Sequence, residues 1–219
     1  MKIATLNLCL GLRNKKDEIK RIIEHNNIDI MCLQETELPG DYPIDLLSFK
    51  GYNYESENNI VKARCGIYIS NTLSYVRRAD LESAGTHVVI IDVNDNERTR
   101  IINIYRSFNP QNNESQIDFF TRQLAIISNA INNSTIVMGN FNLNHAKKFD
   151  MNYSHKNYFT KLNESFDSKD LIQIVNFDTW SRQINGTHHS SILDHVYVKN
   201  PININNLSSL TPPHLEIIC

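Results

Sequence analysis

The hydrophobic positions at the start of the chain repeat first as in a strand, then as in a helix, and then as in a strand again. Residues 2–8 and 28–35 are rich in apolar side chains, as strands are, and between them Ile19, Ile22 and Ile23 recur at helical spacing among the charged residues of 14–24. A strand, a helix and a second strand form a βαβ unit, in which the two strands run parallel. We therefore expect both strands to end at the same edge of a sheet.

The next part of the chain alternates short runs of strand type with polar turns. Residues 51–57 are typical of a turn, and strands are expected at 65–70, 73–76, 87–93 and 100–105. Because the strands follow one another through short polar connections, we expect an antiparallel meander. Residues 114–131 then place a row of apolar side chains on one helical face, which predicts a long amphipathic helix.

A β-branched run, residues 135–138, stops at Gly139 and passes into alternating polar residues, Asn140, Asn142 and Asn144. This pattern predicts a buried strand that delivers the three asparagines to a loop at its C-terminal end. An ordinary Asx-turn leaving a strand is the alternative.

Weaker patterns follow in the rest of the chain. They predict a short helix at 155–162, a helix or a strand at 170–175, a strand at 190–198 and a last strand at 215–218.

Length and charge limit the possible functions. The 219 residues, of 25.3 kDa, suit one domain over 1–219. The net charge of −2 gives no global basic field, so any phosphate binding must come from a local patch or a metal. The chain begins without an extended apolar leader and has no apolar run long enough to span a membrane, so we expect neither secretion nor membrane insertion.

The four cysteines are not paired at short spacing, which favours reduced, buried thiols over a zinc site or a disulfide framework. This cysteine usage favours an intracellular protein.

Several short motifs resemble those of one family. Gly139-Asn140-Phe141-Asn142 resembles the Gly-Asp-Phe-Asn segment of the endonuclease/exonuclease/phosphatase superfamily. Further motifs occur in the family's order: Leu6-Asn7, Leu33-Gln34-Glu35-Thr36, Asn103-Ile104-Tyr105, Ile192-Leu193-Asp194-His195-Val196 and Pro213-His214. The chain looks most like the endonuclease domain of a non-LTR (LINE-type) retrotransposon. The resemblance implies an α/β fold, a four-layer α/β sandwich of two packed mixed β-sheets flanked by helices, as in deoxyribonuclease.

The parallel strands of the βαβ unit make Asn7 and Glu35 neighbours at one sheet edge. A hard divalent cation takes oxygen ligands, so this pair is the candidate site for Mg²⁺ (or Mn²⁺). The alternative for Glu35 is a solvated charge at a strand end.

The resemblance also implies catalytic roles. Tyr105 and Asn142 would donate hydrogen bonds to the phosphate in the transition state. His214 would contact the phosphate, with Asp194 orienting its ring, and Asn140 would lie near the attacking water. A core tyrosine and a surface histidine are the alternatives for Tyr105 and His214.

DNA contacts in this family come from loops around the site. The candidates here are Asn144, Arg106, Lys147 and Arg182, with Lys148 and Gln183 in addition. Each of the charged residues is equally typical of a solvated surface.

Two positions depart from the family's pattern. Asn140 has an amide where the family has a carboxylate, and Pro213 stands where the family has an aspartate. We therefore expect an Mg²⁺-dependent endonuclease that nicks target DNA for retrotransposition but is weakened or inactive. Its partners would be DNA and the reverse transcriptase domain of the same polyprotein, in the nucleus. A catalytically silent binding module and a phosphoester phosphatase are the alternatives.

Overall fold

The computed structural model describes residues 1–9, 11–58, 61–94, 98–109, 114–184, 186–199 and 207–208. The expected strand at 215–218, together with His214 and Pro213, lies outside these residues.

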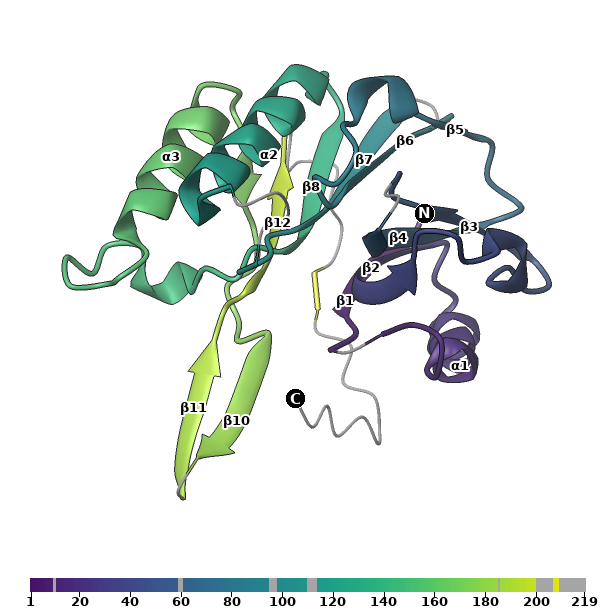
Figure 1. Ribbon diagram of the computed structural model, residues 1–219, viewed down its shortest axis with the longest axis horizontal. Coiled ribbons are helices and arrows are strands. Elements are labelled where there is room, and N and C mark those ends of the chain that lie inside the picture. Colours follow the sequence, from purple (N-terminus) through teal and green to yellow (C-terminus); the bar gives the residue numbers. More distant parts are fainter. Residues whose placement is uncertain are drawn as a thin grey trace.

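Two β-sheets lie face to face (Figure 1). The first has the order β1-β2-β4-β3 and the second the order β5-β6-β7-β8-β12-β9, with a separate hairpin of β10 and β11. The strands of the first sheet are β1 (Ile3–Asn7), β2 (Ile30–Pro39), β4 (Lys62–Ser70) and β3 (Tyr52–Ser56). Those of the second are β5 (Tyr75–Arg77), β6 (Val88–Val93), β7 (Thr99–Tyr105), β8 (Thr135–Asn140), β12 (Asp194–Val198) and β9 (Ile172–Gln173). The hairpin strands are β10 (Trp180–Ile184) and β11 (Thr187–Ser191).

Helices cover the outer faces of both sheets, which gives the four-layer α/β sandwich that was predicted (Figure 1). Helix α1 (Lys16–Asn26) packs on the first sheet through Ile19 and Ile23. Helices α2 (Gln116–Ala130) and α3 (Lys156–Asp167) pack on the second. Short 3-10 helices are found at Ile44–Leu46, Ala79–Leu81 and His145–Lys147.

The inner faces of the two sheets form the central core. Cys32, Cys65 and Ile67 of the first sheet pack there with Val89 and Ile101 of the second. Strands β6 and β7 are buried along their whole length because this sheet is covered on both faces, which explains their nearly continuous apolar sequences.

Hydrogen bonds of Asn103 cross the central core. Asn103 of β7 accepts a 2.6 Å hydrogen bond from Gln34 of β2 and donates to the backbone carbonyls of Leu33 and Gly66. A buried amide is stable only when its hydrogen bonds are satisfied, so this contact holds the two sheets in one relative position.

The structure corrects several sequence-based expectations. Residues 51–57 are not a turn, since β3 pairs there with β4. The antiparallel meander is confirmed for β5, β6 and β7, but β4 belongs to the other sheet, because the connection after Ser70 crosses between the sheets. The strand expected at 190–198 is divided: its first two residues belong to the end of β11, and 194–198 form the whole of β12. The ambiguous segment at 170–175 contains the short strand β9, and the helix expected at 155–162 continues to Asp167.

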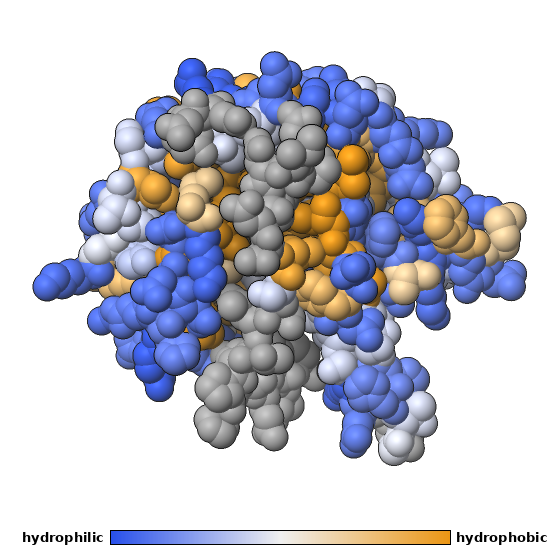
Figure 2. Space-filling view, turned by 180° about the vertical axis from the view of Figure 1, so that it is seen from behind, coloured by the Kyte–Doolittle hydropathy of each residue, from blue (hydrophilic) through white to orange (hydrophobic). Residues whose placement is uncertain are grey.

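Seen from behind, hydrophilic residues surround a central band of apolar ones (Figure 2). Among the described residues, no helix is both long and apolar enough to cross a membrane. Cys32 and Cys65 are free and buried, as expected from their spacing, but Cys9 is disulfide-bonded, which corrects the expectation of a reduced thiol at that position.

Candidate active site

Asn7, the last residue of β1, and Glu35 of the parallel strand β2 are neighbours, as predicted, but β2 does not end at Glu35 and continues to Pro39. Asn7 Nδ2 donates a 2.9 Å hydrogen bond to Glu35 Oε1, and Asn7 Oδ1 accepts one from the backbone N–H of Cys9. The pairing of β2 with β4 is irregular between Gln34 and Leu38, and Glu35 has a positive φ of 54°. Such a bulge redirects a side chain out of the regular alternation of the strand.

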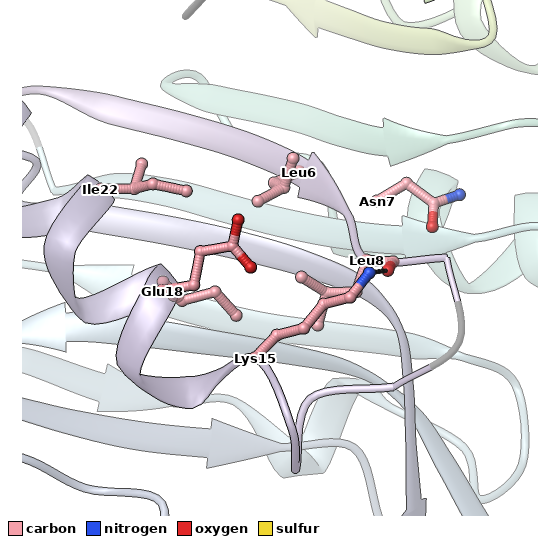
Figure 3. A pocket seen from close by; sticks show the side chains of 7 residues that line it. Leu6, Asn7, Leu8, Lys15, Glu18 and Ile22 are labelled. Atoms are coloured by element: carbon pink, nitrogen blue, oxygen red, sulfur yellow. Dashed lines mark hydrogen bonds between the residues drawn. The ribbon is translucent and has the colours of Figure 1, made fainter. Parts of the chain in front are cut away.

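A lysine holds the turn that follows Asn7. Lys15, just before α1, donates through Nζ to the backbone carbonyls of Leu8 and Cys9. Figure 3 shows Lys15 reaching Leu8 across a small recess between β1 and α1, with the Asn7 side chain pointing away from the helix. The recess has room for no more than a water molecule. The Lys15 hydrogen bonds across it hold the backbone that follows Asn7.

Three predicted residues are neighbours across the second sheet. Tyr105 of β7 pairs with Asn140 of β8, and Asn140 pairs with Asp194 of β12. Gly139 permits this close pairing, because a Cβ on it would lie 2.0 Å from the carbonyl oxygen of Ile104. The strand register therefore brings Tyr105, Asn140 and Asp194 to one edge.

The loop after β8 is held by hydrogen bonds from its own asparagines. Asn140 Oδ1 accepts a 2.7 Å bond from the backbone N–H of Asn142, and Asn142 Nδ2 donates a 2.7 Å bond to the carbonyl of Arg106. Asn142 has a positive φ of 51°, a conformation that asparagine tolerates better than most residues. The Asx-turn expected as the ordinary alternative is thus present, and it orients Asn142.

Electrostatic effects connect the two sheets. Burial, followed by the charge of Glu35, raises the pKa of Tyr105, so its hydroxyl stays protonated and can donate a hydrogen bond. Burial also raises the pKa of Asp194 to about 7, with the charge of Glu35 adding to the shift and a hydrogen bond from Thr179 opposing it. The charge of Glu35 on the first sheet therefore acts on both residues of the second.

The donors at this edge fit a magnesium ion. Glu35 supplies a carboxylate with the Asn7 amide beside it. Asp194 Oδ1, on the facing sheet, is buried without a hydrogen-bond partner among the described residues. Within the same residues, no group of three or more histidine, cysteine or acidic side chains could hold a metal. Mg²⁺ is commonly held through one or two carboxylates, with water and substrate oxygens completing its shell, so Glu35 is the residue that could hold it.

Two further candidates occupy structural positions. Arg106 is only 1% exposed, and its guanidinium lies 4.1 Å from the ring centroid of Tyr158 and donates to the carbonyls of Phe141 and Asn142. Asn144 is buried and bonds to Ser191 and to the backbone of Ile192. Both side chains are therefore buried, whereas contact with DNA needs an open loop position. Arg106 is enclosed by Phe120 of α2 and Tyr158 of α3.

The remaining candidates are exposed or lie outside the described residues. Lys147 is exposed after β8, and Arg182 and Gln183 are exposed on the β10–β11 hairpin, which extends away from the body of the protein (Figure 1). His214, which the resemblance pairs with Asp194, is not among the described residues.

Sequence reasoning missed the residues that support the site from behind. Lys15 bonds to the carbonyl of Leu8 beside Asn7, and Thr179 accepts a hydrogen bond from the backbone N–H of Asp194. Arg106 was predicted only as a DNA contact, but it bonds to the carbonyl of Asn142. Nothing in hydrophobic periodicity marks such contacts, because each depends on which segments the fold brings together.

Comparison with known proteins identifies the family. The sequence matches the profile of the Endonuclease/Exonuclease/phosphatase family over residues 4–215. The chain belongs to this family. A sequence comparison with curated proteins finds no significant match.

Solved structures of this family share the fold. The endonuclease domain of TRAS1, a telomere-specific non-LTR retrotransposon, aligns with a TM-score of 0.64 and 13% identity, covering 89% of this chain and 83% of that one. The 3′ phosphatase NExo from Neisseria, bound to a product DNA hairpin, aligns with a TM-score of 0.63 and 17% identity, covering 90% and 86%. An AP endonuclease from Archaeoglobus fulgidus aligns with a TM-score of 0.62 and 14% identity, covering 92% and 87%. At these identities the similarity establishes the fold.

Proposed function

We propose that this member of the endonuclease/exonuclease/phosphatase family is a metal-dependent DNA endonuclease whose activity is weakened by Asn140. The observation that carries the proposal is geometric: Asn7 and Glu35 are hydrogen-bonded on the first sheet, and the strand register places Tyr105, Asn140 and Asp194 side by side on the second. Acidic and neutral hydrogen-bonding groups at one edge are what binding and hydrolysis of a phosphodiester require.

Each residue has a distinct role in this proposal. Glu35 and Asn7 would hold Mg²⁺ or Mn²⁺, which when bound stabilises negative charge on a phosphate oxygen, and Asp194 would orient the ring of His214. Tyr105 would donate from its neutral hydroxyl to another phosphate oxygen, and Asn142 would donate the amide hydrogen that it does not use toward Arg106. His214 would contact the phosphate, as in the family's motif.

Asn140 explains the expected loss of activity. Its side-chain oxygen keeps the 2.7 Å contact with the N–H of Asn142, so the amide preserves the loop, but an amide cannot accept a proton from water at neutral pH. General acid–base catalysis is worth about 10²–10⁴-fold in rate. The same geometry supports a second candidate, a catalytically silent family member that binds nucleic acid without cutting it.

DNA would be contacted through exposed positive and polar groups on either side of this edge. Lys147 and Lys148 follow the Asn142 loop, and Arg182 and Gln183 project on the hairpin. If the protein acts in retrotransposition, the nick would prime a reverse transcriptase domain of the same polyprotein, in the nucleus. The similarity to the TRAS1 endonuclease domain supports this assignment at the level of the fold.

Supercoiled plasmid incubated with Mg²⁺ tests the proposal. We expect Asn140→Asp to convert the plasmid to the open-circular form at least about 100-fold faster than the parent chain. The double variant Asn140→Asp/Glu35→Gln should return to the parent rate, which controls for a contaminating nuclease.

The other outcomes separate the alternatives. DNA binding by both chains with nicking by neither would support the silent binding module instead. Release of inorganic phosphate from a 3′-phosphorylated oligonucleotide, without nicking, would support a phosphatase.

A further inference from the structure

The segment between β8 and α3 exposes two large apolar side chains. Phe149 is 85% exposed and Met151 is 74% exposed, the highest values for large hydrophobic residues in the described part of the chain. Single exposed apolar residues are common on protein surfaces, but two at this exposure, two positions apart and close to a candidate site, need an explanation.

This segment, residues 145–155, is an ordered turn. The backbone N–H of Asp150 donates to the carbonyl of Lys147, and that of Asn152 donates to the carboxylate of Asp150. Lys148 Nζ lies 4.7 Å from the centroid of the Phe149 ring. The turn therefore presents the ring to solvent in a defined position.

The turn is also tethered to the candidate site. The backbone N–H of Asn144 donates a 2.9 Å hydrogen bond to the hydroxyl of Tyr153, whose ring packs against Phe159 of α3. Asn144 lies two positions after Asn142, so a ligand of the turn would be held beside the edge that carries Asn142.

Charge gives the chemistry of the ligand. Lys148 Nζ lies against the Phe149 ring, Lys156 Nζ lies 2.8 Å from the sulfur of Met151, and Lys147 precedes both in the chain. Asp150 is the only acidic residue of 147–156, on a chain whose net charge is −2. Positive groups beside an open aromatic face are the combination that binds unpaired nucleotides, because the cations attract phosphate and the ring stacks on a base.

We propose that the turn binds an unpaired nucleobase of the DNA by stacking it on Phe149, with Met151 beside it and Lys147 on a neighbouring phosphate. The inference rests on the proposed function, because it assigns a preferred form to the same DNA. A base inside a duplex has both faces covered by its neighbours, so stacking on Phe149 requires a base that is single-stranded or extruded. The preferred ligand is therefore DNA with a bulge or an unpaired segment.

Fluorescence anisotropy with three labelled DNAs of one sequence tests this inference: a single strand, a full duplex and a duplex with a one-nucleotide bulge. We expect Phe149→Ala and Phe149→Leu to weaken binding of the single strand and of the bulged duplex by about tenfold, with little change for the full duplex. Phe149→Trp should keep the affinity. Leu46→Ala, at a 62% exposed leucine of the first half of the chain, is the matched control and should change nothing.

A spectroscopic readout detects the stacking itself. With 2-aminopurine at the bulge, the parent chain should quench its fluorescence and Phe149→Leu should not. Unchanged affinity and quenching in Phe149→Ala, or an equal loss for all three DNAs, would overturn the inference. If Asn140→Asp nicks plasmid while Phe149→Ala binds as the parent does, this inference alone fails; if the parent chain binds none of the DNAs, the proposed function fails with it.

Discussion

Asn142 and Arg106 are bonded reciprocally. The side-chain amide of Asn142 donates a 2.7 Å hydrogen bond to the backbone carbonyl of Arg106, and the guanidinium of Arg106 donates a 3.2 Å bond to the carbonyl of Asn142. Because the guanidinium is also packed against Tyr158 of α3, the Asn142 loop is attached to the helical layer of the protein. The position of a candidate catalytic amide thus depends on a buried cation.

Replacing this cation should loosen the loop. We expect Arg106→Met, which keeps most of the side-chain volume, to lower the free energy of unfolding by about 1–3 kcal/mol, because buried carbonyls lose their donor. Urea denaturation measures the change. Arg122→Met is the matched control: Arg122 also contacts an aromatic ring, and it pairs with Glu114, but its side chain is 36% exposed, so its loss should cost less than about 1 kcal/mol. Equal effects of the two variants would contradict the special role of Arg106.

Glu35 should determine the response to magnesium. A ligand that binds only the folded state raises the melting temperature, so Mg²⁺ should stabilise the parent chain. We expect Glu35→Gln to abolish this shift, because it removes a charged oxygen ligand but keeps the acceptor for Asn7. Glu24→Gln, an equal change of charge on the exposed side of α1, should keep the shift. A magnesium response that survives Glu35→Gln would exclude Glu35 as the principal ligand.

Gly139 should tolerate no side chain. In Gly139→Ala the new Cβ would lie 2.0 Å from the carbonyl oxygen of Ile104, so the pairing of β7 and β8 would have to open. We expect a loss of at least about 3 kcal/mol in the free energy of unfolding. Gly51→Ala separates the steric effect from the backbone effect: Gly51 also has a positive φ, of 87°, but has nothing within 4 Å of its added Cβ. That control should cost only about 1 kcal/mol.

His195 should make the fold sensitive to acid. Burial lowers the pKa of His195 to about 3, and its ring bonds to the carbonyl of Leu143 and to the hydroxyl of Tyr197. Between its ordinary pKa of 6.5 and this value, the unfolded chain binds a proton that the folded chain does not. Stability should therefore fall as the pH drops from about 6.5 toward 3, by an amount on the order of a few kcal/mol.

Denaturation of His195→Gln at several pH values tests this expectation. The variant should lose less stability than the parent chain between about pH 6.5 and pH 4. His25→Gln, at an exposed histidine of α1, should follow the parent. The same slope in all three chains would mean that His195 does not carry the acid sensitivity.

The sequence by itself determined the local parts of this site. The βαβ pattern placed Asn7 beside Glu35, because parallel strands joined by one helix must end at the same edge, and the run ending at Gly139 delivered Asn140 and Asn142 to a loop. Both predictions follow from short-range rules of chain geometry. The four-layer fold was predicted from the resemblance to the family, which rested on the order of the motifs along the chain.

Only the tertiary structure decided which distant groups meet. The effect of the Glu35 charge on Tyr105 and Asp194 depends on how the two sheets pack. The strand pattern placed β4 in the meander and gave no sign that the chain crosses to the other sheet after β4. Arg106 follows Tyr105 like a loop residue, yet it is buried because α2 and α3 close over it. Such contacts join residues far apart in the sequence, and the free energy that selects them belongs to the packed core as a whole.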